Sequence, residues 1–142
     1  MFDRPIRSVM NEHRKKFFTA GPNETVSNAA KLMRAKGIGA ILIVDNERLV
    51  GIFTERDALF RVLAKGLDPE KTTLGSVMTA DPKTLGPERT YGHALLVMQE
   101  SGFRHMPVVV DGQAVGIVSS RNAMDPDLEE FVWQERQREH HR

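Results

Sequence analysis

An internal repeat constrains the fold of this chain more than any other sequence feature. A shift of 65 positions aligns residues 19–58 with residues 84–123 without a gap. Thirteen of these 40 positions carry identical residues, whereas average composition predicts roughly two or three. An upstream motif, Ser8-Val9-Met10, returns as Ser76-Val77-Met78 at an offset of 68. The chain is therefore predicted to contain two copies of one structural unit.

The repeat divides the 142 residues into four segments. We expect a first unit over residues 1–66 that includes the N-terminal segment, a polar linker over 67–73, a second unit over 74–124, and a C-terminal helical tail over 125–142. The tail prediction rests on Asp125 as the helix cap and Pro126 at the first helical position. Its basic end suits the helix dipole and suggests an appendage against the core or a partner.

Each copy begins with an amphipathic helix that ends at a glycine, Gly37 in the first copy and Gly102 in the second. The apolar positions of these helices are Val26, Ala29, Ala30 and Met33 in the first copy, and Tyr91, Ala94, Leu95 and Met98 in the second. Both helices would present one apolar face to a common core.

Two short strands rich in β-branched residues follow each helix and are joined by a tight turn. The strands are predicted at residues 40–44 and 49–53 in the first copy and at 106–110 and 114–118 in the second. The returning strands contain Gly51 and Gly116 at mid-strand, which marks a bulge or a close approach by a backbone or ligand.

A second helix is predicted directly after the returning strand. In the first copy its buried positions would be Ala58, Leu59, Val62 and Leu63, and its solvent-facing positions Glu55, Arg56, Arg61 and Lys65. A unit of about 50 to 60 residues is too small to be comfortable alone. The predicted fold is therefore mixed α/β (α+β), with two units packed about a pseudo-twofold axis and clefts between them.

The motif Gly51-Ile52-Phe53-Thr54-Glu55-Arg56-Asp57 carries the most chemical information. It places a hydroxyl and a carboxylate three positions apart at a strand-to-helix junction, where both would face one cleft. One carboxylate can accept hydrogen bonds from both hydroxyls of a ribose. The same spacing also describes a capping box that only satisfies backbone N–H groups. The second copy has Ser119 and Asn122 in the matching places, so its cleft would hold ribose more weakly, hold another group or stay empty.

The repeated pattern resembles a tandem pair of CBS domains, often called a Bateman module. The resemblance covers about Ser8 to Met124 and rests on the two Val-Met starts, the Pro22-Asn23-Glu24-Thr25-Val26 and Pro87-Glu88-Arg89-Thr90-Tyr91 segments, and the Gly51 to Asp57 motif. It implies two βαββα units and adenosine-containing ligands such as AMP, ADP, ATP, S-adenosylmethionine or NADH. It also implies a flat homodimer of modules that acts on an unidentified effector protein.

The resemblance assigns roles to individual residues. It implies that Thr54 and Asp57 hold a ribose in the first cleft, with Ser119 and Asn122 as the weaker counterpart. Arg104 and His105 of the second copy match the segment whose basic side chains reach ligand phosphates, because an arginine fork and a histidine donor suit phosphate. Arg56 and Arg121 are the lesser phosphate candidates.

Composition narrows the classes of function. The chain has no cysteine, which excludes disulfides, a thiol nucleophile and thiolate metal sites. No apolar run is long enough to span a membrane, and the start of the sequence lacks a secretory signal, so we expect a cytoplasmic protein. No residue spacing indicates a catalytic nucleophile, a phosphate-binding loop or a metal site, so we expect neither an enzyme nor a catalytic cofactor.

Three hypotheses of function follow, with an enzyme as a remote fourth. The first is a regulatory module that binds an adenine nucleotide and changes a partner's interface. The second is a ligand-free dimerisation or scaffold protein, in which Thr54 and Asp57 only cap a helix. The third, disfavoured by the net charge of +1, is nucleic-acid binding through Arg4, Arg7, Arg14, Lys15 and Lys16.

Overall fold

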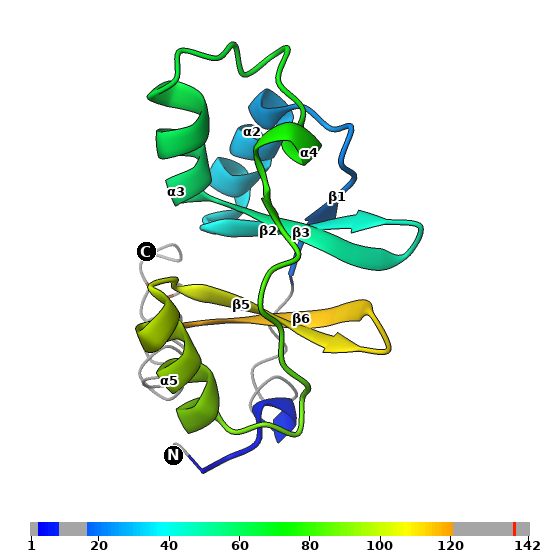
Figure 1. The fold of residues 1–142 in the computed structure, drawn as a ribbon, viewed down its shortest axis with the longest axis vertical. Helices are drawn as coiled ribbons and strands as arrows, with labels where there is room; N and C mark the ends of the chain where they lie inside the picture. Colours follow the sequence, from blue (N-terminus) through cyan, green and yellow to red (C-terminus); the bar gives the residue numbers. More distant parts are fainter. Residues whose placement is uncertain (1–2, 9–16, 121–137, 139–142) are drawn as a thin grey trace.

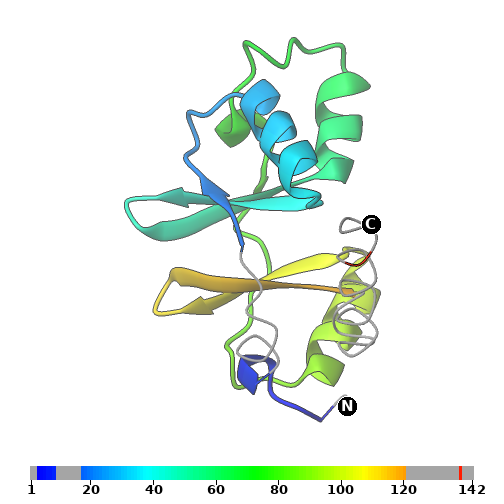
Figure 2. The same ribbon diagram turned by 180° about the vertical axis from the view of Figure 1, so that it is seen from behind.

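The two repeats stack so that their sheets face each other and their helices lie outside (Figure 1). The structure is a computed structural model that describes residues 3–8, 17–120 and 138. The layers run helix, sheet, sheet, helix, with α2 and α3 above the upper sheet and α5 below the lower one. The view from behind shows the same order (Figure 2). The predicted α+β class with two packed units is therefore confirmed.

The first repeat is built on a four-stranded sheet in the order β1-β2-β3-β4, whose last strand comes from the start of the second repeat. These strands are β1 (Thr19–Ala20), β2 (Ala40–Asp45), β3 (Arg48–Thr54) and β4 (Thr79–Ala80). β1 is parallel to β2, whereas β3 is antiparallel to both β2 and β4. Its helical elements are α2 (Val26–Lys36), α3 (Glu55–Asp57) and the π-helical segment η1 (Ala58–Leu63). A short helix, α4 (Leu74–Val77), precedes β4.

The second repeat reproduces this order as far as the structure describes it. Its elements are α5 (Tyr91–Ser101), β5 (His105–Val110) and β6 (Gln113–Ser119). Leu85 forms a parallel bridge with Val108, so it takes the place that β1 has in the first repeat. The predicted tail over 125–142 and the residues after Ser120 lie outside the described residues, except Arg138.

Threonine caps the start of both long helices, and both helices end at the glycines that the sequence predicts. Thr25 caps α2 and Thr90 caps α5, each accepting a hydrogen bond from the backbone N–H three residues later at 3.1 Å. Gly37 and Gly102 end these helices with φ of 63° and 77°, a left-handed conformation that favours glycine. The predicted apolar stripes are buried or partly buried except at Ala30, which is exposed. Leu32 packs against the core instead.

Both hairpins carry a bulge beside the mid-strand glycine. In β3 the register shifts opposite Ile43 and Val44, next to Gly51, and in β6 it shifts opposite Val108 and Val109, next to Gly116. Gly51 is also closely approached, because a Cβ built there would meet Met78 Sδ at 2.3 Å and Thr79 O at 3.0 Å. The mid-strand glycines therefore mark bulges as predicted, and Gly51 makes room for the segment that leads into β4.

The second helix of the first repeat differs from the prediction. Val62 is buried and Ala58 packs against the core, but Leu59 and Leu63 are 49% and 71% exposed. The segment is wound as a π-helix, with Ala64 N–H donating to Leu59 O at 2.9 Å. A π-helix has more residues per turn than the assumed α-helix. The buried stripe is therefore narrower than an α-helical pattern predicts.

The two repeats exchange their starting segments. Ile6 is fully buried in the core of the second repeat, and Leu74 is fully buried in the core of the first. Backbone hydrogen bonds repeat the exchange: Ile6 N donates to Arg89 O and Leu74 N donates to Glu24 O, both at 2.8 Å. Each short starting helix thus completes the other repeat. The boundaries predicted at 66, 74 and 124 stay predictions.

Apolar side chains also join the two sheets directly. On β2, Ile41 and Ile43 face the helices of their own repeat, whereas Leu42 belongs to a cluster with Ile52 that includes Ile117 of β6. The hairpin tips meet as well, because Leu49 N–H donates to Gly112 O at 3.0 Å. Both faces of β2 are therefore buried, which holds the two sheets at a fixed separation around the clefts.

Candidate functional site

A cavity of about 840 Å³ opens between the two repeats. One wall comes from the first repeat, at the end of β3 and along α3 and η1. A second comes from the segment around β4, including Thr79 and residues 81–83, and a third from residues 101–105 of the second repeat. The volume lies within the range of small-molecule sites. This cavity contains both Thr54 and Asp57, so the prediction that they face one cleft is confirmed.

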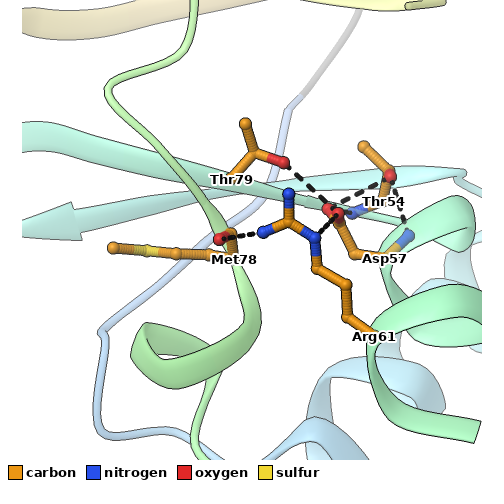
Figure 3. A network of polar contacts seen from close by, with 5 residues as sticks. All are labelled: Thr54, Asp57, Arg61, Met78 and Thr79. Carbon is orange, nitrogen blue, oxygen red and sulfur yellow. Dashed lines mark hydrogen bonds and ion pairs between the residues drawn. The ribbon is translucent and has the colours of Figure 1, made fainter. Parts of the chain in front are cut away.

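The Asp57 carboxylate lies at the centre of a polar network at the wall of the cavity (Figure 3). Its side chain is only 7% exposed. Oδ2 accepts hydrogen bonds from the backbone N–H and the hydroxyl of Thr54, at 2.9 and 3.2 Å. Oδ1 accepts from the Thr79 hydroxyl at 3.2 Å and pairs with Arg61 Nε at 3.5 Å. A carboxylate has about four acceptor positions, so these four donors account for all of them.

Part of this arrangement is a helix cap. The Asp57 N–H donates to the Thr54 hydroxyl at 3.3 Å while Thr54 N–H donates to Asp57 Oδ2, which completes a capping box. The capping interpretation of the motif is therefore confirmed. The cap uses Oδ2, whereas both donors at Oδ1 are side chains that come from outside the motif.

Arg61 connects Asp57 to the segment that leads into the second repeat. Its Nη1 donates to the Met78 carbonyl at 2.9 Å while Nε faces Asp57 Oδ1 (Figure 3). The helical pattern predicts a solvent-facing Arg61, but its side chain is 47% exposed and its guanidinium contacts both Asp57 and the Met78 carbonyl. Its place four residues after Asp57 brings the two charges together along the helical turn.

The second repeat contributes Arg104 and His105 to the opposite wall of the cavity. Arg104 is exposed, and His105 is half-buried near Glu55. Burial lowers the pKa of His105 below its usual value; the negative charge of Glu55 opposes this shift, and the positive charge of Arg104 adds to it. The structure thus brings these two residues into one cavity with Thr54 and Asp57.

The first repeat has Gly39 and Ala40 at the positions of Arg104 and His105, and Gly39 lies close to side chains of both repeats. It aligns with Arg104, and a Cβ built on it would meet Glu55 Oε1 at 2.3 Å and His105 Cε1 at 3.4 Å. The missing side chain leaves room for these groups from the two repeats.

The apolar part of the lining comes from Leu59, Phe60 and Phe103. Arg56 also lines the cavity, and its guanidinium lies over the Phe60 ring, 5.3 Å from the centroid. The exposed apolar surface left by the π-helical winding therefore forms part of the cavity lining.

The counterpart residues of the second copy are described only in part. Ser119 lies at the end of β6, opposite His105 in the ladder, and is half-buried. Asn122 and Arg121 lie outside the described residues. A second cavity of about 560 Å³ is lined by Arg89, His93 and the β5–β6 turn, and Ser119 is not part of it. The weaker ribose site stays a prediction.

Only some of the basic residues of the nucleic-acid hypothesis lie in the described part of the chain. Arg14, Lys15 and Lys16 lie outside the described residues. Arg7 forms an ion pair with Glu88. Within residues 3–8, 17–120 and 138, no group of three His, Asp or Glu side chains is placed to hold a metal ion, and no helix is long and apolar enough to cross a membrane.

Sequence reasoning missed Thr79 and Arg61 as partners of Asp57, and the segment over residues 81–83 as a wall. Thr79 is 22 positions from Asp57, so no local spacing connects them. A usable signal existed nevertheless. The repeated Ser-Val-Met motif and the mid-strand glycine together predict that the chain after Met78 passes close to β3.

Comparison with known proteins identifies the repeated unit. The family model for the CBS domain matches residues 6–64 and 74–126. A CBS domain-containing protein of Arabidopsis thaliana, CBSCBSPB3, is 34% identical over 119 residues, which cover 83% of this chain. The aligned region makes up 21% of that curated relative, so the chain spans about a fifth of its length.

Solved structures agree with the fold. A crystal structure of the CBS domain protein NE2398 superimposes with a TM-score of 0.82 at 27% identity, covering 88% of this chain and 98% of the other. The CBS domain pair of MJ0100, solved in complex with 5-methylthioadenosine and S-adenosylmethionine, gives 0.74 at 28% identity, covering 85% and 93%.

Proposed function

The chain belongs to the CBS-domain family, whose paired domains are regulatory modules, and we propose that it binds an adenosine-containing ligand in the cavity between its repeats. The candidates are AMP, ADP, ATP, S-adenosylmethionine and NADH. The observation that carries the proposal is Asp57, a buried carboxylate at the wall of a cavity large enough for such a ligand. The MJ0100 domain pair, which was solved with two adenosine compounds, supports this class of ligand.

The expected binding mode follows from the polar groups of the three walls. The ribose hydroxyls donate to the Asp57 carboxylate, where hydrogen bonds to a charged acceptor are strong. Phosphate or other anionic groups extend toward Arg104 and His105, with Arg56 as a further donor. The adenine ring packs against the apolar lining at Leu59 and Phe60. The event is binding, without turnover.

The proposed output is a change in the relative position of the two repeats. The cavity touches both repeats and the segment between them, so a ligand that fits one arrangement better shifts the protein toward it. The altered surface is then presented to an effector protein by a cytoplasmic homodimer of modules.

A thermal-melting screen tests the function. The protein is heated with each of the five candidate compounds, and a ligand at about 100 times its Kd adds about 2.7 kcal/mol of stability, which shifts the melting temperature by several degrees. The test variant is Asp57→Ala. The control is Glu100→Ala, which removes an exposed carboxylate of α5 outside the cavity. We expect Asp57→Ala to lose the shift and Glu100→Ala to keep it.

The competing function is a ligand-free scaffold, and the capping box at Thr54 and Asp57 favours it specifically. On this hypothesis none of the compounds changes the melting temperature of the wild-type protein. Asp57→Ala then costs only the capping energy, about 0.5–2 kcal/mol. That result would replace the sensor proposal with the scaffold.

A further inference from the structure

Four cationic side chains line the cavity in the described part of the chain. Of these, only Arg61 has a described contact with Asp57. Three other cations line the same cavity. Arg56 lies over Phe60, Lys83 donates to the Ser101 hydroxyl at 3.0 Å, and Arg104 is exposed on the opposite wall. The guanidinium of Arg61 therefore stands where the ribose of the proposed ligand must bind.

We propose that Arg61 is an internal competitor for the ribose, and that it makes the cavity select phosphorylated adenosine compounds over uncharged ones. This proposal rests on the proposed function. In the structure Arg61 Nε pairs with Asp57 Oδ1 at 3.5 Å, and Nη1 donates to the Met78 carbonyl at 2.9 Å. A ribose that donates both hydroxyls to Oδ1 displaces the Thr79 hydroxyl and the guanidinium together, because the other oxygen is held by the helix cap.

The two donors at Oδ1 differ in what their displacement costs. The Thr79 hydroxyl is neutral and can rotate to another acceptor. Arg61 carries a full charge and loses its counterion when a ribose takes Oδ1, so an uncharged nucleoside leaves it without compensation. The binding energy of adenosine is reduced by that loss.

A phosphate group compensates the displaced guanidinium. Arg61 lines the same cavity as the basic wall, and its side chain is 47% exposed, so it has room to turn toward a bound anion. A guanidinium binds phosphate through paired hydrogen bonds, in the same geometry that it uses with a carboxylate. Arg61 therefore exchanges one anion for another when AMP binds, and this exchange distinguishes AMP from adenosine.

Calorimetric titration with adenosine and AMP tests the proposal. The variant is Arg61→Met, which keeps an unbranched side chain and removes the charge. The matched control is Lys65→Met, which removes one positive charge at an exposed position just beyond η1 and outside the cavity lining. We expect Arg61→Met to bind adenosine at least about threefold more tightly and to lower the preference for AMP over adenosine at least about fivefold.

Lys65→Met should leave both affinities within about twofold of the wild type. If Arg61→Met binds adenosine with unchanged or reduced affinity while the wild type binds AMP, the competitor proposal is overturned and the proposed function stands. If neither protein binds either compound, both proposals fail. Circular dichroism confirms folding, and Arg61→Gln replaces Arg61→Met if the latter is unfolded.

Discussion

The carboxylate of Asp57 performs two tasks with its two oxygens. Oδ2 closes the helix cap with Thr54, and Oδ1 faces Thr79 of the neighbouring strand β4 and Arg61 of the next helical turn. Burial of a charge is costly unless donors surround it, and this carboxylate is 7% exposed with four donors. The cap therefore fixes the group in place, while the side-chain donors at Oδ1 leave that oxygen exchangeable.

At His105 the structure predicts a dependence of stability on pH. Burial lowers the pKa of His105 in the folded protein below the usual value of 6.5. Between the two values the unfolded chain binds more protons than the folded one, so the free energy of unfolding falls as the pH drops through about 6.5. We expect the urea midpoint to fall between about pH 7.5 and about pH 5.5, and His105→Gln to show a smaller fall.

The matched histidine variant is His93→Gln, on the exposed surface of α5. It should retain the wild-type loss of midpoint over the same pH interval. An equal loss in His105→Gln and in the wild type would show that His105 is not held neutral by its surroundings.

Among the secondary-structure elements, the ends of the long helices are specified most locally. In both repeats a threonine accepts a hydrogen bond from the backbone N–H three residues later and starts the helix, and a glycine in the left-handed conformation ends it. Both residue types are local signals in the sequence. The winding of η1 was not readable. An α-helical and a π-helical winding are both compatible with the same apolar pattern, so periodicity alone does not distinguish them.

Gly37→Ala tests the helix end. The φ of 63° at Gly37 is strained for any residue with a Cβ, although the site has open space around it. We expect a loss of about 1 kcal/mol in the free energy of unfolding, measured by urea denaturation. Gly21→Ala is the control, because its site is equally open and its φ is not left-handed. It should change stability by no more than about 0.5 kcal/mol, and an equal loss in both variants would contradict the account.

For the whole molecule, the exchange of starting segments makes the two repeats depend on each other. Each unit lacks part of its own core: Ile6 completes the second repeat and Leu74 completes the first. The shared core between the sheets adds to this dependence. A ligand in the cavity between the repeats therefore acts on a molecule whose halves are linked at their starts, their sheets and their hairpin tips.

Truncation of the exchanged residues should loosen the repeat that receives them. Ile6→Ala is expected to cost about 2–4 kcal/mol and to reduce hydrogen-exchange protection mainly in β5 and β6. Leu74→Ala is the reciprocal variant and should reduce protection mainly in β2 and β3. The same protection pattern in both variants would argue against the exchange.

The sequence predicted the architecture because the repeat, the helix caps and the strand periodicity are local signals present twice. It also predicted Thr54 and Asp57 on one cleft and Arg104 and His105 as its basic pair, which the structure places in a single cavity. The exchange of Ile6 and Leu74 was not predictable, since it depends on which of two similar cores a segment enters. Similar apolar patterns in the two repeats cannot make that distinction.

The measurement that tests the central claim most directly is a calorimetric comparison of AMP with 2′-deoxy-AMP, on the wild type and on Asp57→Ala. If the Asp57 carboxylate accepts both ribose hydroxyls, loss of one charged hydrogen bond should weaken binding to the wild type at least about tenfold. The two compounds should bind Asp57→Ala equally, because the acceptor is gone. Equal affinity of the wild type for both compounds, or the same ratio in both proteins, would contradict a ribose on Asp57.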